Sequence, residues 1–130
     1  MAAVDTSSLL AEIAIQQFGD IVAAVEVVSW SQQRVRVMRL RLVDQSFLDI
    51  RLTARGDYSY HWEHRMVDGG IHRWDNAPHY QHIVTYPHHL HNGEETNVVA
   101  SSLPFALADE ALEYILAFVA TCLRSDANRT

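Results

Sequence analysis

Residues 48–65 alternate apolar and polar side chains with a period of two, and the alternation is interrupted once, at the turn sequence Arg55-Gly56-Asp57. A strand places successive side chains on opposite faces, so this alternation predicts two strands that each have one wet face. Strands joined by a short turn pair in the antiparallel manner. The stretch therefore predicts an antiparallel sheet with one buried face and one face exposed to water.

The stretches on both sides of this pattern extend the predicted sheet. Their residues predict further strands at 21–30, 34–43 and 71–74, a short extended piece at 83–86 and a last strand at 96–100. The alternation changes phase near Met38, which predicts a β-bulge there. The sequence Val67-Asp68-Gly69-Gly70 predicts a tight hairpin turn. Consecutive strands joined by short turns indicate an antiparallel meander of about five or six strands.

Helical patterns flank the strands at both ends of the chain. Residues 5–18 carry apolar side chains at the helical period, and Gly19-Asp20 ends that pattern. We expect a second helix to begin near Pro104 and its tail, about residues 124–130, to be frayed. Its expected apolar face comprises Leu107, Ala111, Ile115, Phe118, Val119 and Cys122. The expected fold is α+β, one domain over residues 1–130, with an N-terminal and a C-terminal helix packed on one face of the sheet.

Bulk composition narrows the class of protein. The chain has 130 residues, of which 48% are hydrophobic and 20% charged, which is typical of one soluble domain. Its net charge of -6 disfavours tight non-specific binding to nucleic acid and suits a basic protein partner. No apolar run reaches the roughly 18 residues that span a bilayer, and the first residues lack the basic region of a secretory signal. Together with a single cysteine, Cys122, these features predict a cytoplasmic protein without membrane association.

The histidines concentrate the chemistry of the chain in one stretch. All eight lie between His61 and His91. Two phrases stand out there, the segment from Arg73 to His79, which reads RWDNAPH, and the segment from Pro87 to His91, which reads PHHLH. Each phrase interrupts strand-like sequence with a proline and places imidazoles beside it. We therefore place the candidate functional site in this stretch.

A metal site is one interpretation of these histidines. His89 and His91 stand two residues apart, so an extended segment presents both on one face. A third ligand from Asp75, His79 or His82 would complete a zinc-type site with an open position. The His-x-His spacing is short, and the chain contains neither an HExxH nor a CxxC motif. We therefore expect no cofactor, with zinc or another divalent metal held by His89 and His91 as the alternative.

Acid–base catalysis without a metal is a second interpretation. Imidazole both accepts and donates a proton near neutral pH. Cleavage of a phosphodiester needs a base, an acid and a cation for the charge that develops on phosphorus. Arg73 supplies the cation, because its planar fork matches phosphate, and Asp75 holds the tautomer of an imidazole. The candidate proton-transfer residues are His79, His88, His89 and His91.

A structural role is the third interpretation. His61 and His72 lie on predicted strands and are expected to be structural or simply solvated. Trp62 and Trp74 are expected to be core residues and not stacking platforms for a ligand. If the histidines are structural, the domain would not be an enzyme. It would bind a partner protein through its acidic surface and an exposed sheet edge.

The histidine phrases resemble the signature of the TumE family. Tyr60-His61-Trp62, RWDNAPH at 73–79 and YPHHLH at 86–91 are similar to the family phrases RxDNAPHH and TFPHHKH at comparable spacing. Tyr80 and Leu90 depart from the signature, where the family often has histidine and lysine. The motif positions in this chain are Arg73, Asp75, Asn76, Pro78, His79, Pro87, His88, His89 and His91.

The resemblance implies the toxin component of a bacterial toxin–antitoxin module. The partner that it implies is a cognate antitoxin with a helix-turn-helix, and RNA is a candidate target. It supplies no catalytic mechanism, so the alternatives drawn from the residues stay open. These are a metal-independent ribonuclease or other phosphoryl-directed enzyme, a non-enzymatic partner-binding module, and a metal-dependent hydrolase with a His-x-His site.

Overall fold

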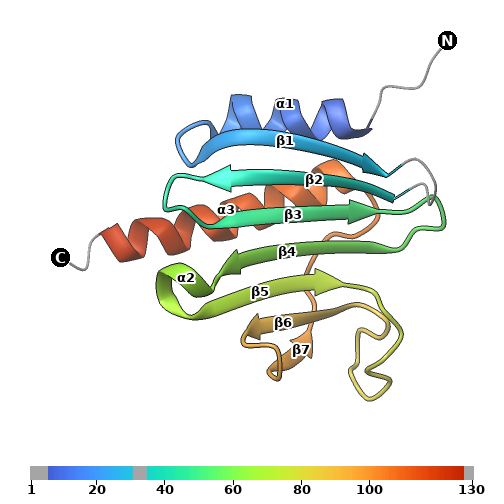
Figure 1. Ribbon diagram of the computed structural model, residues 1–130. Helices are drawn as coiled ribbons and strands as arrows, with labels where there is room; N and C mark the ends of the chain where they lie inside the picture. Colours follow the sequence, from blue (N-terminus) through green and yellow to red (C-terminus); the bar gives the residue numbers. More distant parts are fainter. Residues whose placement is uncertain (1–5, 31–34, 128–130) are drawn as a thin grey trace, which may run out of the picture.

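The computed structural model describes residues 6–30 and 35–127, and Figure 1 shows their α+β arrangement. Helix α1 (Thr6–Phe18) precedes the sheet, the one-turn helix α2 (Arg65–Asp68) joins two of its strands, and α3 (Ala108–Ala127) follows it. Within these residues the sheet has seven strands, each antiparallel to the next in chain order: β1 (Val22–Trp30), β2 (Val35–Leu42), β3 (Phe47–Leu52), β4 (Tyr58–His64), β5 (Gly70–Asp75), β6 (His89–Gly93) and β7 (Val98–Ala100). The predicted meander between two terminal helices is confirmed, with seven strands in place of five or six.

Both terminal helices pack on the same face of the sheet. Helix α1 contributes Leu10, Ile13 and Ala14 to a buried cluster, and α3 lies across the back of the strands in Figure 1. The strand residues in that cluster come from even positions, such as Leu40 of β2 and Ile50 of β3. Odd positions point the other way, because a strand alternates its side chains. We call that second side the open face; it carries Arg39, Arg41, Asp49, Arg51, Ser59, His61, Arg73, Asp75, His89 and His91.

An aromatic cluster fills part of the core between the sheet and α3. Trp62 of β4 and Trp74 of β5 are buried, and Phe118 of α3 meets both rings edge-on at centroid distances of 6.2 and 5.5 Å. His72 stacks beside Trp62 at 5.4 Å, and its Nδ1 atom lies 2.9 Å from Nε2 of His64. The expected core role of both tryptophans is confirmed, and His72 is a structural member of the same cluster.

The β-bulge expected near Met38 is wrong. Strand β2 pairs with both neighbours without a break through Met38, and the register instead shifts in β1, between Val22 and Ala24. Met38 and every second residue after it to Leu42 share one buried face. The opposite phase in the sequence belongs to residues 34–37, whose side chains lie outside the described part of the chain.

The connection between β4 and β5 is longer than a tight hairpin turn. Residues 65–68 form the helical turn α2, and Gly69 ends it by donating its backbone N–H to the carbonyl of Arg65. Gly69 has a φ of 86°, a left-handed conformation that glycine adopts without steric cost. The chain reversal expected at 67–70 is thus present, but as a helical turn capped by glycine.

The segment between β5 and β7 also differs from expectation. Residues 83–86 form turns and not an extended piece, because two backbone N–H groups there bond to carbonyls three residues earlier. Residues 89–93 form strand β6, which the sequence does not predict because the asparagine and glycine at its end disfavour strands. The last strand expected at 96–100 is present in its second half, as β7.

Helix α3 begins and ends later than expected. It starts at Ala108, four residues after Pro104, and continues to Ala127, beyond the point where fraying was expected. Leu107 therefore precedes the helix and is 55% exposed, whereas Leu112 is 0% exposed in the core. In the described part of the chain, no helix combines the length and the apolar character that crossing a membrane requires.

Candidate functional site

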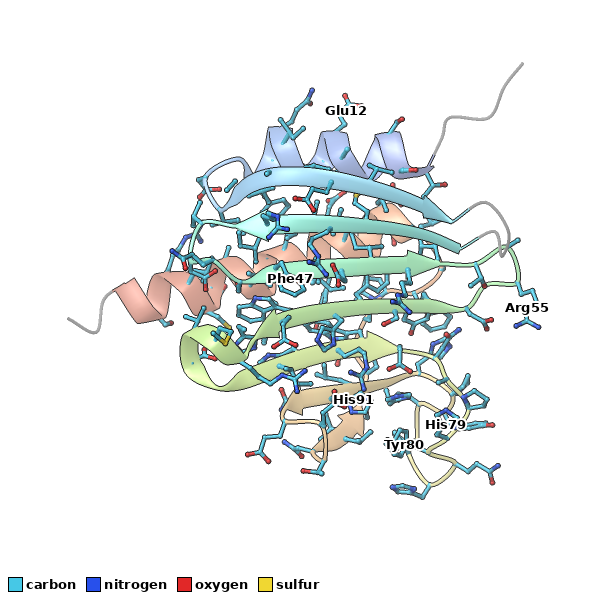
Figure 2. All side chains as sticks on the ribbon, viewed as in Figure 1. Glu12, Phe47, Arg55, His79, Tyr80 and His91 are labelled. Atoms are coloured by element: carbon cyan, nitrogen blue, oxygen red, sulfur yellow. The ribbon has the colours of Figure 1, made fainter. Side chains whose placement is uncertain are left out.

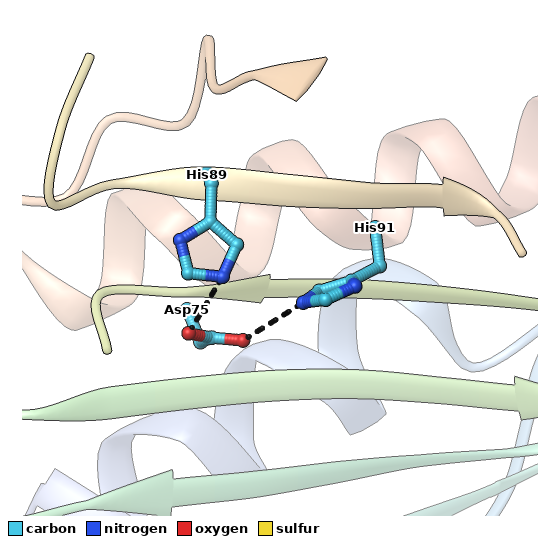
Figure 3. Close-up of side chains that lie close together, drawn as sticks. All are labelled: Asp75, His89 and His91. Atoms are coloured by element: carbon cyan, nitrogen blue, oxygen red, sulfur yellow. Dashed lines mark ion pairs between the residues drawn. The ribbon is translucent and has the colours of Figure 1, made fainter. Parts of the chain in front are cut away.

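The candidate site lies where β5 and β6 pair on the open face. Their antiparallel register sets Arg73 opposite His91 and Asp75 opposite His89. Residues two apart on a strand point the same way, so these four side chains share one face. Figure 3 shows both imidazoles reaching from β6 toward the carboxylate of Asp75. The two histidine phrases of the sequence, at 73–79 and 87–91, thus meet in space.

Asp75 is the centre of this arrangement and is buried. Its Oδ1 atom accepts a hydrogen bond from the backbone N–H of Ala77 at 2.9 Å and lies 3.0 Å from Nε2 of His89. Its Oδ2 atom accepts from Nε of Arg73 at 3.2 Å and lies 3.7 Å from Nε2 of His91. The bond from Ala77 belongs to the turn that ends β5, so Asp75 shapes the turn and anchors the site at once.

Two backbone carbonyls fix the tautomers of the imidazoles. The carbonyl of Pro87 lies 3.0 Å from Nδ1 of His89, and the carbonyl of Glu95 lies 2.8 Å from Nδ1 of His91. A carbonyl only accepts hydrogen bonds, so each Nδ1 carries a proton and donates it. The Nε2 atom of each ring is then the one that faces Asp75. This outer hydrogen-bond pattern is typical of histidines that ligate metals.

The environment of His91 keeps its ring neutral. Burial lowers the pKa of the His91 imidazole below its ordinary value, and the positive charge of Arg73 adds to this effect. Nη2 of Arg73 also donates a hydrogen bond to Nε2 of His91 at 3.3 Å. A lone pair is therefore present on Nε2 of His91 at neutral pH.

Arg73 borders the cluster and is held from its outer side. Its Nη1 and Nη2 atoms donate to the carboxylate of Glu95 at 2.8 and 2.7 Å, and Nη1 lies 3.3 Å from Nδ1 of His61 on β4. The hydrogen bonds between Arg73 and Glu95 raise the pKa of the guanidinium and lower the pKa of the carboxyl group. Because a guanidinium stays charged, a fixed positive charge always lies beside the carboxylate of Asp75.

A cleft of about 810 Å³ opens in front of these side chains. Residues 76–80 form one wall of it, and Arg55 from the turn before β4 contributes to its rim. The ring of Tyr80 lies against both imidazoles, at centroid distances of 4.7 Å from His89 and 5.8 Å from His91. Figure 2 shows Tyr80 on its loop beside His91. A cleft of this size accommodates a small molecule or a short piece of polymer.

The structure gathers four of the six predicted site residues and separates the other two. His88 points away from the cluster, because its ring stacks on Phe105 at 3.8 Å and its Nδ1 atom lies 2.7 Å from the hydroxyl of Tyr58. His79 lines the cleft but is exposed and lies outside the cluster. The residues brought together are Arg73, Asp75, His89 and His91.

Two contributions to the site are missing from the sequence-based prediction. Glu95 supplies a carbonyl to His91 and a carboxylate to Arg73 from the turn that follows β6. The Asn92-Gly93 turn signal indicates a chain reversal there, but nothing in the sequence identifies which residue it brings back. The carbonyl of Pro87 carries no sequence signal at all, since any residue has one.

Asp75, His89 and His91 together can hold a metal ion. One ligand atom from each lies within 4.8 Å of the other two. Of the three candidates for the third ligand, the structure places Asp75 with the His-x-His pair, whereas His79 and His82 are exposed on the loop. Two imidazole nitrogens and one carboxylate oxygen are the protein ligands of many catalytic zinc and non-haem iron sites.

Comparison with known proteins identifies the family of the chain. The family model described as Toxin TumE matches residues 11–123, which include both histidine phrases and all four clustered side chains. No curated protein and no solved structure matches the chain. The match extends over most of the sequence, and the chain therefore belongs to the TumE toxin family.

Proposed function

We propose that this chain is the toxin of a bacterial toxin–antitoxin module and that it acts in the cytoplasm as a metal-dependent hydrolase directed at a phosphoryl group. Membership of the TumE toxin family supports the first half of this proposal. The family resemblance supplies the expected partner, an antitoxin with a helix-turn-helix. Asp75, His89 and His91 are the proposed metal ligands, and Arg73 is the cation that binds the substrate.

The convergence of three ligand atoms carries the proposal. The Nε2 atoms of His89 and His91 lie 3.0 and 3.7 Å from oxygens of Asp75. In a tetrahedral zinc site with bonds of about 2.1 Å, two ligand atoms are about 3.4 Å apart. The first separation runs to Oδ1 of Asp75 and the second to Oδ2, and both are of the same order as this value. Backbone carbonyls lie beside Nδ1 of each imidazole, which leaves both Nε2 atoms to face a metal.

Burial favours a metal over direct proton transfer by the histidines. His89 and His91 are 1% and 3% exposed, with Tyr80 against both rings. A general acid or base must come within hydrogen-bond reach of the substrate, whereas a metal ligand need not touch it. A metal-independent mechanism would draw its proton-transfer residues from His79, His88, His89 and His91. Only His89 and His91 lie in the cluster, so that alternative has less support.

The residues of the chain have separate roles in this proposal. A divalent ion held by the three ligands would activate water and polarise a phosphoryl oxygen. Asp75 and the carbonyls of Pro87 and Glu95 orient the imidazoles. Arg73 lines the cleft with its Nη1 and Nη2 atoms bonded to Glu95, and its positive charge would lie beside a bound phosphoryl group.

Metal content is the first test. The chain is produced without a polyhistidine tag, dialysed and titrated with Zn²⁺ or with Co²⁺. The visible absorption of bound Co²⁺ reports its ligands. We expect one ion per chain, and its loss in His89→Ala and in His91→Ala. The matched control is a double variant, His79→Ala with His82→Ala, which removes two exposed histidines from the loop and keeps the cluster.

Growth of a bacterial host on induction is the second test. The wild type and the loop double variant should arrest growth, and His91→Ala should not, with circular dichroism showing that each variant is folded. Arrest by a folded His91→Ala variant would contradict the proposal. So would a metal ion that stays bound in His91→Ala and is lost from the loop double variant.

A further inference from the structure

The cleft of the candidate site adjoins a second cleft on the open face. The second cleft has a volume of about 450 Å³, and Ser59, Arg73 and Glu95 line both. The other residues that line it belong to β3, β4 and the start of α2; they are Asp49, Arg51, His61 and Arg65. The two clefts therefore adjoin along the three shared residues, and together we call them the groove, which crosses β3, β4 and β5 and ends at the proposed metal centre.

Strand register explains the shape of this groove. Arg51 pairs with Ser59, and Ser59 pairs with Asp75, so the three residues form one row across the strands. The short side chain of Ser59 lies between two longer ones and leaves a depression. Neighbouring strands are about 4.8 Å apart, so the backbone of Arg51 lies about 10 Å from the backbone of Asp75.

The acidic residues that line the second cleft are already neutralised. Asp49 accepts two hydrogen bonds from Arg39, at 2.7 and 2.9 Å. Glu95 accepts two from Arg73. Each of these acids has a bidentate cationic partner, so neither contributes a free negative charge that would repel an anion from the groove.

Arg51 is the cation of the groove that has no acidic partner among the described residues, and its side chain is exposed. Arg65, another cation of the second cleft, is bound by Glu63 at 2.7 Å. Hydrogen bonding to Arg65 lowers the pKa of Glu63 to about 2, so this pair stays ionised and mutually satisfied. The second cleft therefore has one excess positive charge, and Arg51 carries it.

We propose that the groove binds a single-stranded polynucleotide through its backbone, with one phosphate at the proposed metal centre and a neighbouring phosphate at Arg51. This inference rests on the proposed function, because it takes the metal centre as the end of the groove at which the substrate reacts. The planar fork of arginine matches the geometry of phosphate. A net charge of -6 repels a polyanion, so affinity must come from a few local contacts and not from a broad basic face.

Length-dependent binding tests this inference. Fluorescence anisotropy measures the affinity of the metal-loaded chain for labelled uridine oligomers of one, two, four and eight nucleotides, with electrophoresis confirming that the oligomers remain intact. We expect affinity to rise between one and four nucleotides and then to level off. Arg51→Gln should weaken binding of the four-nucleotide oligomer and leave binding of the mononucleotide unchanged. For one lost phosphate contact the slope of log affinity against log salt should become shallower by about 0.7.

Arg41→Gln is the matched control for charge. Arg41 lies on the same open face, pairs with Glu26 and lines neither cleft. Its removal should leave every affinity unchanged. Equal losses in Arg41→Gln and Arg51→Gln would overturn the inference, as would an eight-nucleotide oligomer that binds no better than a mononucleotide.

Two further arms separate the causes of failure. Deoxy oligomers of the same length should bind about as well as the ribose forms, since the inference assigns affinity to phosphates; a loss of tenfold or more would overturn that assignment. If the wild type binds no metal but its affinity for oligomers still depends on Arg51, the proposed function fails and the groove stands. If the metal binds and the oligomers do not, the groove fails and the metal centre stands.

Discussion

His88 and His89 are adjacent in the chain but point in opposite directions. Nε2 of His89 meets Asp75 on the open face, while the ring of His88 stacks on Phe105, in the segment that leads to α3. Alternation along an extended backbone explains the difference. The histidines that the sequence groups into one cluster therefore belong to two environments.

Alanine substitution at these two positions should separate function from packing. His89→Ala should abolish metal binding and growth arrest. His88→Ala should preserve both and lower the free energy of unfolding by about 1 kcal/mol, because it removes a ring stack and one hydrogen bond. Chemical denaturation and the growth assay measure the two effects. A folded His88→Ala chain that no longer arrests growth would place His88 in the active site.

Replacing Tyr80 by histidine (Tyr80→His) should add a fourth protein ligand to the proposed metal centre. The ring of Tyr80 lies 4.7 Å from that of His89 and 5.8 Å from that of His91, so an imidazole in its place can approach the same ion. We expect zinc to bind about tenfold more tightly, a gain of about 1.4 kcal/mol, measured by competition with a chelator. Tyr86→His makes the same substitution at an exposed position of the loop and is the control. Equal affinities in the two variants would show that position 80 does not reach the metal.

Helix α3 allows a direct test of where its buried face begins. Leu112→Ala should lower the free energy of unfolding by about 2–5 kcal/mol, as is usual when a fully buried leucine is truncated. Leu107→Ala should change it by less than about 0.5 kcal/mol, because this leucine is exposed before the helix. Urea denaturation of the two variants gives the comparison. Equal costs would return Leu107 to the apolar face that the sequence assigns it.

Acid should destabilise the fold through His72. Burial, and then the charge of nearby His64, lower the pKa of His72 from 6.5 to about 4. The unfolded chain therefore binds a proton near pH 6.5 that the folded chain does not accept until about pH 4. As the pH falls through this window the free energy of unfolding should drop, by about 1–2 kcal/mol after allowing for partial exposure of the ring.

Urea denaturation at pH 7 and pH 4.5 measures the acid effect. His72→Gln removes the titrating ring, so its free energy of unfolding should depend less on pH across the same window. An identical pH dependence in His72→Gln and in the wild type would assign the acid sensitivity to other groups.

The sheet is predictable from sequence where alternation acts alone. In β3 and β4 the apolar residues recur with period two, and that period has a direct geometric meaning. Strand β6 is different, because its residues His89, Asn92 and Gly93 do not predict a strand. Hydrogen bonding to β5 and β7 determines their conformation instead. The phase change near Met38 likewise misleads, since it reflects residues before Met38 and not a bulge within the paired strand.

The sequence predicts the region of the site but not which of its side chains meet in space. Asp75, His89 and His91 are identifiable as candidates because aspartate and histidine ligate metals and because two-residue spacing shares a face. Selecting Asp75 and excluding His88 requires the register between β5 and β6, which the loop of residues 76–88 determines. The partnership of Arg73 with Glu95 spans 22 positions and arises only from the turn after β6.

The strands have the same order in the sheet as along the chain. Strands that are far apart in the sequence are therefore also far apart across the sheet. The proposed metal ligands lie on β5 and β6, while α1 packs beside β1 at the far edge, as Figure 1 shows. A fluorescent protein fused ahead of α1 would thus be separated from the proposed metal ligands by the width of three intervening strands, β2, β3 and β4. The same fusion inserted in the turn at 94–97 would lie directly beside Glu95. Imaging reagents for this protein in living cells are therefore best built from its N-terminal side.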